Sequence, residues 1–347
     1  MKSNKNVRKF IYFIAFITFL ACKDEPQHPT ISRGFYHWKT KFSLSKSEKE
    51  ILDTLHIQKL YIHFFDVDYD FTQKQATPKA LVQLGAMPTQ EIVPTVFITN
   101  RTIQQLSQAQ ILDLAKNILL KINELCKEKA IHYQEIQLDC DWSKTTKSKY
   151  FLLLHTLKKQ LPSKCKLSAT IRLHQIKFAD ITGVPPADRG LLMCYNVDDW
   201  RSEQTQNSIF DARVVEQYLH NFESYDLPLD IAMPIFSQTI VYRNHQFLTF
   251  LNNKKENELT SSYFLEKTSK EHTFIAKKDT SAWGFAFRKG DIFRAESPDF
   301  DAQKIISEQL IKKIKNDSLT FLLYHLDTPI IDSYTYEKLK SVFPKDN

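Results

Sequence analysis

Two hydrophobic periodicities alternate along this chain. Short apolar runs rich in β-branched and aromatic residues are typical of strands, and most are separated by segments with apolar residues every three or four positions, as in helices. The eight strand-like runs are Gly34–Trp38, Lys59–Val67, Ile92–Thr99, Glu135–Trp142, Lys166–His174, Gly190–Val197, Asp230–Phe236 and Leu319–His325. This order predicts an α/β protein with a (β/α)8 TIM barrel. The alternative is an open doubly wound sheet, whose usual glycine fingerprint the chain lacks.

The helical patterns and one long interruption complete the predicted architecture. Gln238–Pro298 separates the seventh strand from its helix and is too long for an ordinary loop. It contains several strand-like pieces and a helical piece near Tyr263–Thr268, so we predict a small α+β insertion between strand 7 and helix 7 of a barrel spanning 32–343. The helical patterns are Ser45–Leu55, Pro78–Leu84, Ile103–Lys129, Thr146–Leu161, Asp211–Ser224, Ala302–Lys315 and Asp332–Val342.

The N-terminus indicates export. A basic segment precedes the apolar run Phe10–Ala21, which is too short to span a bilayer as a helix. Leu20-Ala21-Cys22 resembles a bacterial lipobox, which implies a signal peptide over 1–21, a lipid on Cys22 and a polar tether over 22–31. We expect an outer-membrane lipoprotein. The following Lys23-Asp24-Glu25 resembles a surface-export signal, which would place the protein on the cell surface. The alternatives are a plain secretory peptide or a short anchor.

Composition and charge indicate which classes of partner and cofactor to expect. The formal net charge is +7, of which four cations lie in the basic segment before Phe10, leaving about +3 for the rest. This is no nucleic-acid footprint, and we expect a monomer. The chain has only six glycines and no phosphate-binding glycine loop, so no cofactor is predicted, and no metal-binding motif occurs. The cysteines that follow Cys22 permit disulfides, but we favour free thiols for Cys126, Cys140, Cys165 and Cys194.

The most informative segment for chemistry is Glu135–Trp142, which reads EIQLDCDW. Gln137, Asp139 and Asp141 share one face of this strand, and apolar residues occupy the other. Two carboxylates about 7 Å apart along a strand repel each other, which tends to raise one pKa and suits acid–base catalysis. The strand's carboxyl end is also where TIM barrels build active sites. A buried polar network at the barrel centre is the structural alternative.

Other strands supply candidates for the same end of the barrel. Tyr195 shares its face with Met193, and Arg172 and His174 share a face of the fifth strand. His37, with Phe35, and His63 are expected to point inward from the first two strands. Inward histidines could in principle form a metal site, but no spacing supports one. Trp142, like the chain's other tryptophans, lies where an aromatic face could stack on a sugar ring.

These features together resemble the family 18 glycoside hydrolases, the chitinases and their relatives. Asp139-Cys140-Asp141-Trp142 fits the D-x-D-W part of the family's D-x-x-D-x-D-x-E motif, and Met193-Cys194-Tyr195-Asn196 fits its M-x-Y-[DN] motif. The predicted insertion lies where the family has one. In this register Ile136 takes the place of the first aspartate and Ser143 that of the catalytic acid.

The resemblance implies a carbohydrate ligand and a glycoside hydrolase-like activity. Asp141 would be the main catalytic carboxylate, with Asp139 and Tyr195 as its partners. The residues expected to bind substrate are Arg172, His174, Trp142, His63, His37 and Asn196. The general acid remains unassigned, with Asp66, Asp198, Asp199 and Glu296 as loop candidates. The alternative function is a non-catalytic glycan-binding surface lipoprotein on a decayed hydrolase barrel, which Ser143 favours.

Overall fold

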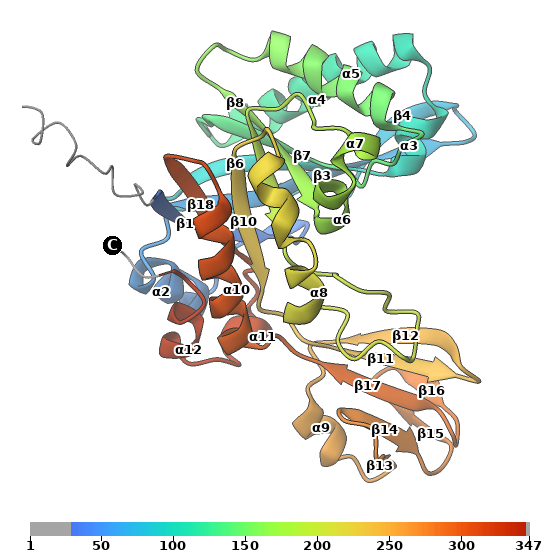
Figure 1. Ribbon diagram of the computed structural model, residues 1–347. Coiled ribbons are helices and arrows are strands. Elements are labelled where there is room, and N and C mark those ends of the chain that lie inside the picture. The colour runs from blue at the N-terminus through green and yellow to red at the C-terminus, as the bar shows by residue number, and fades with distance from the viewer. Residues whose placement is uncertain (1–28, 345–347) are drawn as a thin grey trace, which may run out of the picture.

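Eight parallel strands close into a barrel in the computed structural model, which describes residues 29–344 (Figure 1). The first strand pairs with the second and the last, which closes the cylinder. The TIM-barrel prediction is therefore confirmed. In chain order the strands are β1 (Thr30–His37), β3 (Lys59–Asp70), β6 (Glu91–Ile98), β7 (Glu135–Asp139), β8 (Lys166–Arg172), β9 (Arg189–Met193), β10 (Leu229–Pro234) and β18 (Ser318–Tyr324).

Helices cover the outside of the barrel and bury their apolar faces against it. Capping boxes mark where two of them begin: Ser45 and Glu48 cap α2, and Ser107 and Gln110 cap α4. The helices are α2 (Lys46–Thr54), α3 (Asn100–Gln105), α4 (Gln108–Glu128), α5 (Lys147–Gln160), α6 (Leu173–Lys177), α7 (Ala179–Thr182), α8 (Ala212–Glu216), the 3-10 turn Leu219–Ser224, α10 (Phe300–Lys313), α11 (Thr328–Ile331) and α12 (Tyr336–Lys340). None of the helices within 29–344 is long and apolar enough to cross a membrane.

Two of the helices predicted for this outer layer were wrong. The helix predicted over Pro78–Leu84 is replaced by β4 (Gln75–Lys79) and by β5 (Gln83–Leu84), which pairs with β2 (Lys41–Phe42). Strand β3 continues beyond the barrel, and β4 pairs antiparallel with that extension. The long helix predicted after Ile103 is broken before Ser107, because that serine caps a new helix.

Residues between β10 and α10 form a separate sheet that extends away from the barrel (Figure 1). We call Gln238–Glu296 the lobe. Its five-stranded antiparallel sheet has the order β12-β11-β17-β14-β13 and its own apolar cluster around Phe264 and Phe293. The residues predicted to be helical near Tyr263–Thr268 form a turn followed by a short strand, and the helix of the lobe lies earlier in the chain. The lobe's elements are β11 (Gln238–Arg243), β12 (Gln246–Asn252), α9 (Glu256–Thr260), β13 (Leu265–Lys267), β14 (Thr273–Ala276), β15 (Thr280–Ala282), β16 (Phe285–Phe287) and β17 (Ile292–Glu296).

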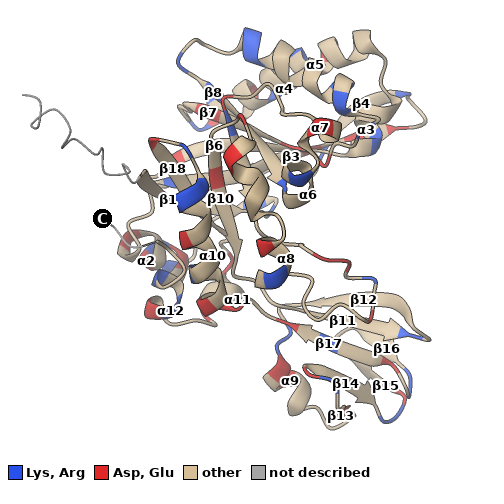
Figure 2. Ribbon diagram, viewed as in Figure 1, with Lys and Arg blue, Asp and Glu red and all other residues tan. Residues whose placement is uncertain are grey.

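The space inside the barrel is aromatic as well as polar. Tyr36, Tyr61 and Tyr195 cluster there with Met193 and Leu322, separate from the apolar core between strands and helices. The four cysteines between 29 and 344 are free thiols, as predicted. Charges of both signs are interspersed over the barrel helices and the lobe (Figure 2).

Candidate active site

Alternate residues of β7 and its extension form a column of polar side chains inside the barrel. Deepest is Glu135, whose carboxylate accepts hydrogen bonds from the hydroxyls of Ser168 (2.6 Å) and Tyr61 (3.1 Å). Gln137 follows and accepts from the Tyr36 hydroxyl. Asp139 and Asp141 continue the column toward the carboxyl end of the barrel, which we call the mouth. The alternation read from the sequence thus holds as far as Asp141.

Asp139 is a carboxyl group whose surroundings favour the protonated form. Its pKa is raised to about 6, chiefly by burial and also by the negative charge of Asp141, and a hydrogen bond from Thr170 (2.7 Å) acts in the opposite direction. A carboxyl that titrates near pH 6 can exchange a proton under ordinary conditions. The sequence prediction that one of the two carboxylates is perturbed therefore applies to the deeper one.

This raised pKa predicts a pH-dependent effect of Asp139→Asn on stability. The contribution of the protonated carboxyl is fully present below the unfolded-state pKa of about 3.9, and it is lost as pH rises through about 6. Asparagine carries no charge and still accepts from Thr170. Relative to wild type, the variant should therefore gain about 1–3 kcal/mol of unfolding free energy between pH 4 and pH 7. Urea unfolding at several pH values measures this gain, and a difference independent of pH would contradict it.

Asp141 forms a bidentate ion pair with Arg172, the last residue of β8. The Arg172 Nε donates to Oδ1 at 2.7 Å and its Nη2 donates to Oδ2 at 3.1 Å. The Asp141 side chain is half exposed, whereas that of Arg172 is only 21% exposed. Arg172 Nη1 also lies 3.5 Å from the backbone carbonyl of Tyr195. The ion pair thus links the ends of β7, β8 and β9 across the mouth.

Aromatic rings surround these groups at the mouth. Tyr195 stacks on Tyr324 with ring centroids 4.7 Å apart, and Phe236 meets Tyr195 edge-on at 6.5 Å. His63 packs on Trp38 at 4.9 Å and its Nε2 lies 2.7 Å from Asp66. Tyr195 and His63 are both buried among these rings.

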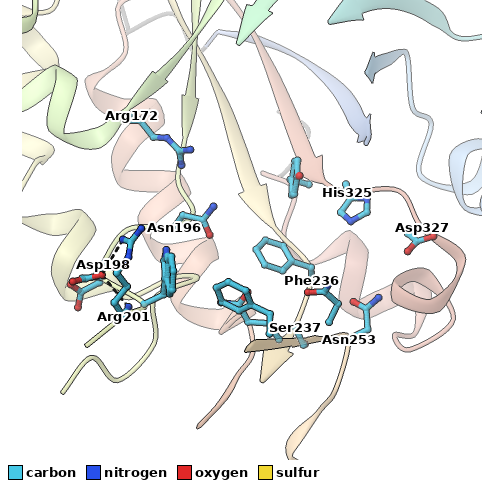
Figure 3. Close-up of a pocket in the computed structure, with 15 residues that line it drawn as sticks. Arg172, Asn196, Asp198, Arg201, Phe236, Ser237, Asn253, His325 and Asp327 are labelled. Carbon is cyan, nitrogen blue, oxygen red and sulfur yellow. Dashed lines mark hydrogen bonds and ion pairs between the residues drawn. The ribbon is translucent and has the colours of Figure 1, made fainter. Parts of the chain in front are cut away.

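A cavity of about 700 Å³ opens between the mouth and the lobe (Figure 3). Arg172, Asn196 and Arg201 lie on one side of it, and His325 and Asp327 lie on the other. Neither Asp139 nor Asp141 is among the lining residues, so Arg172 is the link between this cavity and the carboxyl pair. The lining residues are Arg172, Asn196, Asp198, Asp199, Trp200, Arg201, Phe236, Ser237, Gln238, Phe250, Asn252, Asn253, Tyr324, His325 and Asp327.

The structure contradicts the predicted substrate contact of Trp142. Its ring is 1% exposed, stacks on Tyr150 at 5.3 Å and donates from Nε1 to the Thr182 carbonyl. The chain turns at this point, with the Trp142 amide bonded to the Cys140 carbonyl, so the strand alternation no longer applies. Trp142 therefore packs between the barrel wall and helix α5, away from the mouth.

The predicted positions of two histidines are also wrong. His37 faces the helix layer, fully buried against Phe42, because Tyr36 takes the inward position. Neither ring nitrogen of His37 has a protein partner, and burial lowers its pKa to about 4. His174 lies exposed on α6, since β8 ends at Arg172. The inward histidines do not converge, and no group of three or more metal-ligating residues occurs within 29–344.

The loop acids considered for proton donation fall into separate environments. Glu296 is buried in an ion pair with Arg294 and accepts from Ser208. Asp66 is bonded to His63, whereas Asp198 and Asp199 line the cavity. The sequence predicts an insertion beside the barrel mouth, but it did not identify the lining residues Ser237, Asn252 and Asn253, which belong to no recognisable motif.

The sequence and the structure were compared with those of known proteins, and only the structure has similar counterparts. No protein-family model matches the sequence, and no curated protein matches it in a sequence search. The chitinase of Chromobacterium violaceum superposes with a TM-score of 0.53 at 11% identity, over 90% of this chain and 99% of that one. The Bacillus cereus spore cortex-lytic enzyme SleL gives 0.52 at 13% identity, over 91% and 75%. The family 18 chitinase ChiB of Flavobacterium johnsoniae gives 0.50 at 10% identity, over 90% and 93%. The barrel of this chain is therefore similar in fold to the barrels of these three enzymes.

Proposed function

We propose that this protein is a carbohydrate-active barrel that hydrolyses a glycosidic bond at the mouth. The observation that carries the proposal is the Asp139–Asp141 pair, in which burial shifts the pKa of one carboxyl to about 6 while the other lies at the strand end. A buried carboxyl that titrates near pH 6, with a second carboxyl beside it at the strand end, suits acid–base catalysis. The adjacent cavity, with aromatic, amide and hydroxyl groups in its lining, suits a sugar chain.

The structure suggests a different alignment with the family motif. The acids of D-x-D-x-E share one parity, so all three should face the barrel interior. Ser143 does not, because its amide donates to Thr146 at the start of α5 and its hydroxyl contacts Thr145. Moving the motif by two residues sets Gln137, Asp139 and Asp141 at the three inward positions. Asp141 then takes the place of the catalytic acid, and Asp139 orients the reacting sugar.

One observation favours the second candidate function, glycan binding without catalysis. Both oxygens of Asp141 accept from Arg172, so neither is free to deliver a proton to a substrate. Hydrolysis therefore requires the guanidinium to move away from Asp141 when the glycan binds. A permanent ion pair would leave a binding site without turnover.

A panel of acetamido and uronic-acid oligosaccharides tests the proposal. Release of reducing ends and calorimetric binding are measured on the same wild-type preparation. Turnover of any member supports hydrolysis, and saturable binding without turnover supports the second candidate. The absence of both across the panel would refute a carbohydrate function.

We also propose that the barrel is exported and anchored by a lipid on Cys22, in the outer membrane and facing outward. The signal peptide, Cys22 and most of the tether lie outside the described residues. The support is the lipobox-like Leu20-Ala21-Cys22 after an apolar run. The polar segment that follows is suited to a tether.

Cys22→Ala should abolish lipid attachment. The variant is expected to keep its signal peptide or to leave the membrane fraction, since a lipidated cysteine is the proposed anchor. Membrane fractionation and intact-mass measurement of the mature form report both results, with Cys165→Ala as the matched control. Unchanged mass and unchanged membrane partition in Cys22→Ala would refute the anchor.

A further inference from the structure

We propose that Ser237, Asn253 and His325 form a binding site for a neutral sugar residue, at the side of the cavity facing away from Arg172. Figure 3 shows these three residues together, with Phe236 beside them. The inference rests on the proposed carbohydrate function. It adds where one sugar residue binds and that this sugar is uncharged.

Two buried polar atoms without protein hydrogen bonds point to a ligand here. His325 Nδ1 and Ser237 Oγ both lack a protein partner, and both residues line the cavity. The Tyr334 hydroxyl lies close to Ser237 Oγ, yet the geometry falls short of a hydrogen bond. Buried polar groups in proteins are nearly always paired. A ligand that supplies hydroxyl groups would satisfy both atoms.

The chemistry of this site matches a sugar hydroxyl. A neutral imidazole offers one donor and one acceptor, and the Asn253 amide offers both as well. A hydroxyl group is itself donor and acceptor, so it can pair with either residue in either direction. The rings of Phe236 and Tyr324, with centroids 5.8 Å apart, add an apolar wall for the C–H face of a sugar.

The charges around the cavity disfavour an acidic sugar. Asp327, next to His325, is paired with Lys39 at 2.7 Å, and Lys39 also contacts Glu48 at 3.3 Å. The guanidinium of Arg172 is already paired with Asp141. Over the whole lining, three aspartates stand against two arginines. A uronic acid would therefore meet repulsion that a neutral sugar does not.

Calorimetry with the full-length mature protein tests the site. The probes are tetrasaccharides of glucose, mannose, galactose and N-acetylglucosamine, together with a galacturonic acid tetramer. The variants are Ser237→Ala and His325→Phe, with His325→Asn as a milder change that keeps polar atoms near Nδ1. The matched controls are Ser163→Ala and His132→Phe, which alter exposed residues in loops leading into strands, at the opposite end of the barrel.

The wild type should bind a neutral tetramer more tightly than the acidic one. Ser237→Ala and His325→Phe should each weaken that binding about ten-fold, the loss of one hydrogen bond. His325→Asn should lose less than His325→Phe. Because the replaced atoms have no protein partner, Ser237→Ala should unfold at the wild-type urea midpoint or higher, which a purely structural serine would not.

Two kinds of result would overturn the inference. Preference for the acidic tetramer, or unchanged affinity in Ser237→Ala and both His325 variants, would refute this site while leaving a carbohydrate function standing. A lowered urea midpoint for Ser237→Ala with unchanged affinity would make the serine structural. Failure of the wild type to bind any tetramer, without turnover of any, would refute the proposed function together with the site.

Discussion

Asp141→Asn is expected to lower glycan turnover by about 10²–10⁴-fold while leaving the fold intact, the usual loss on removing a positioned acid–base group. Asp141 is the last inward residue of the β7 column and lies at the mouth. Its side chain is half exposed, so the barrel core does not depend on it. Asparagine keeps the shape but cannot exchange a proton at this position.

Initial rates on the best substrate of the panel measure this effect, and the circular dichroism spectrum reports the fold. Asp53→Asn, an exposed change on α2, is the matched control and should keep the wild-type rate. Turnover that persists at the wild-type rate in Asp141→Asn would show that another carboxylate carries the reaction. In the binding-only alternative the variant changes affinity alone, because it frees Arg172.

Arg294→Met is expected to lower the free energy of unfolding by about 3–5 kcal/mol, since it leaves a buried carboxylate without its counter-ion. The side chains of Arg294 and Glu296 are 2% and 0% exposed, and their closest atoms lie 2.9 Å apart. Arg294 also donates to the backbone carbonyls of Ser202 (2.7 Å) and Trp200 (3.4 Å). The substitution therefore also loosens the loop that carries Trp200 to the cavity.

Urea unfolding of three proteins separates the contributions. Arg294→Met alone should show the full loss, and Arg294→Met combined with Glu296→Gln should recover part of it, because the second change removes the uncompensated charge. Lys313→Met, which breaks an exposed pair with Glu223, is the control and should leave the unfolding midpoint unchanged. A loss of less than about 1 kcal/mol in Arg294→Met would show that water reaches the Glu296 carboxylate.

The barrel could be predicted because its strands carry a local signal. All eight predicted runs overlap barrel strands, since a buried parallel strand needs a continuous apolar segment wherever it occurs in the chain. The outer layer was harder. Gln75–Lys79 became a strand only because the extension of β3 offered it an unpaired edge, and that edge cannot be seen in the segment itself.

The candidate site shows the same difference between features that a single segment determines and features that depend on distant segments. Asp139 and Asp141 could be placed on the same face of their strand from the sequence, because alternation along one strand fixes which side chains share a face. His37 was misplaced because Tyr36 and His37 are both amphipathic, and the polarity of the barrel interior decides which one faces inward. The cavity was only partly foreseen, because much of its wall comes from the lobe, far from β7 in sequence.

The closure of the barrel by β1 and β18 bears on how this chain folds. The register pairs Thr30 with Ser318 and Phe35 with Leu323, so the two partners enter the cylinder from opposite ends of the sequence. Bringing such distant segments together incurs a large loop-closure entropy before any contact compensates for it. Until β18 has been synthesised and has paired with β1, the edge of β1 stays unpaired and can form strand pairs with other chains.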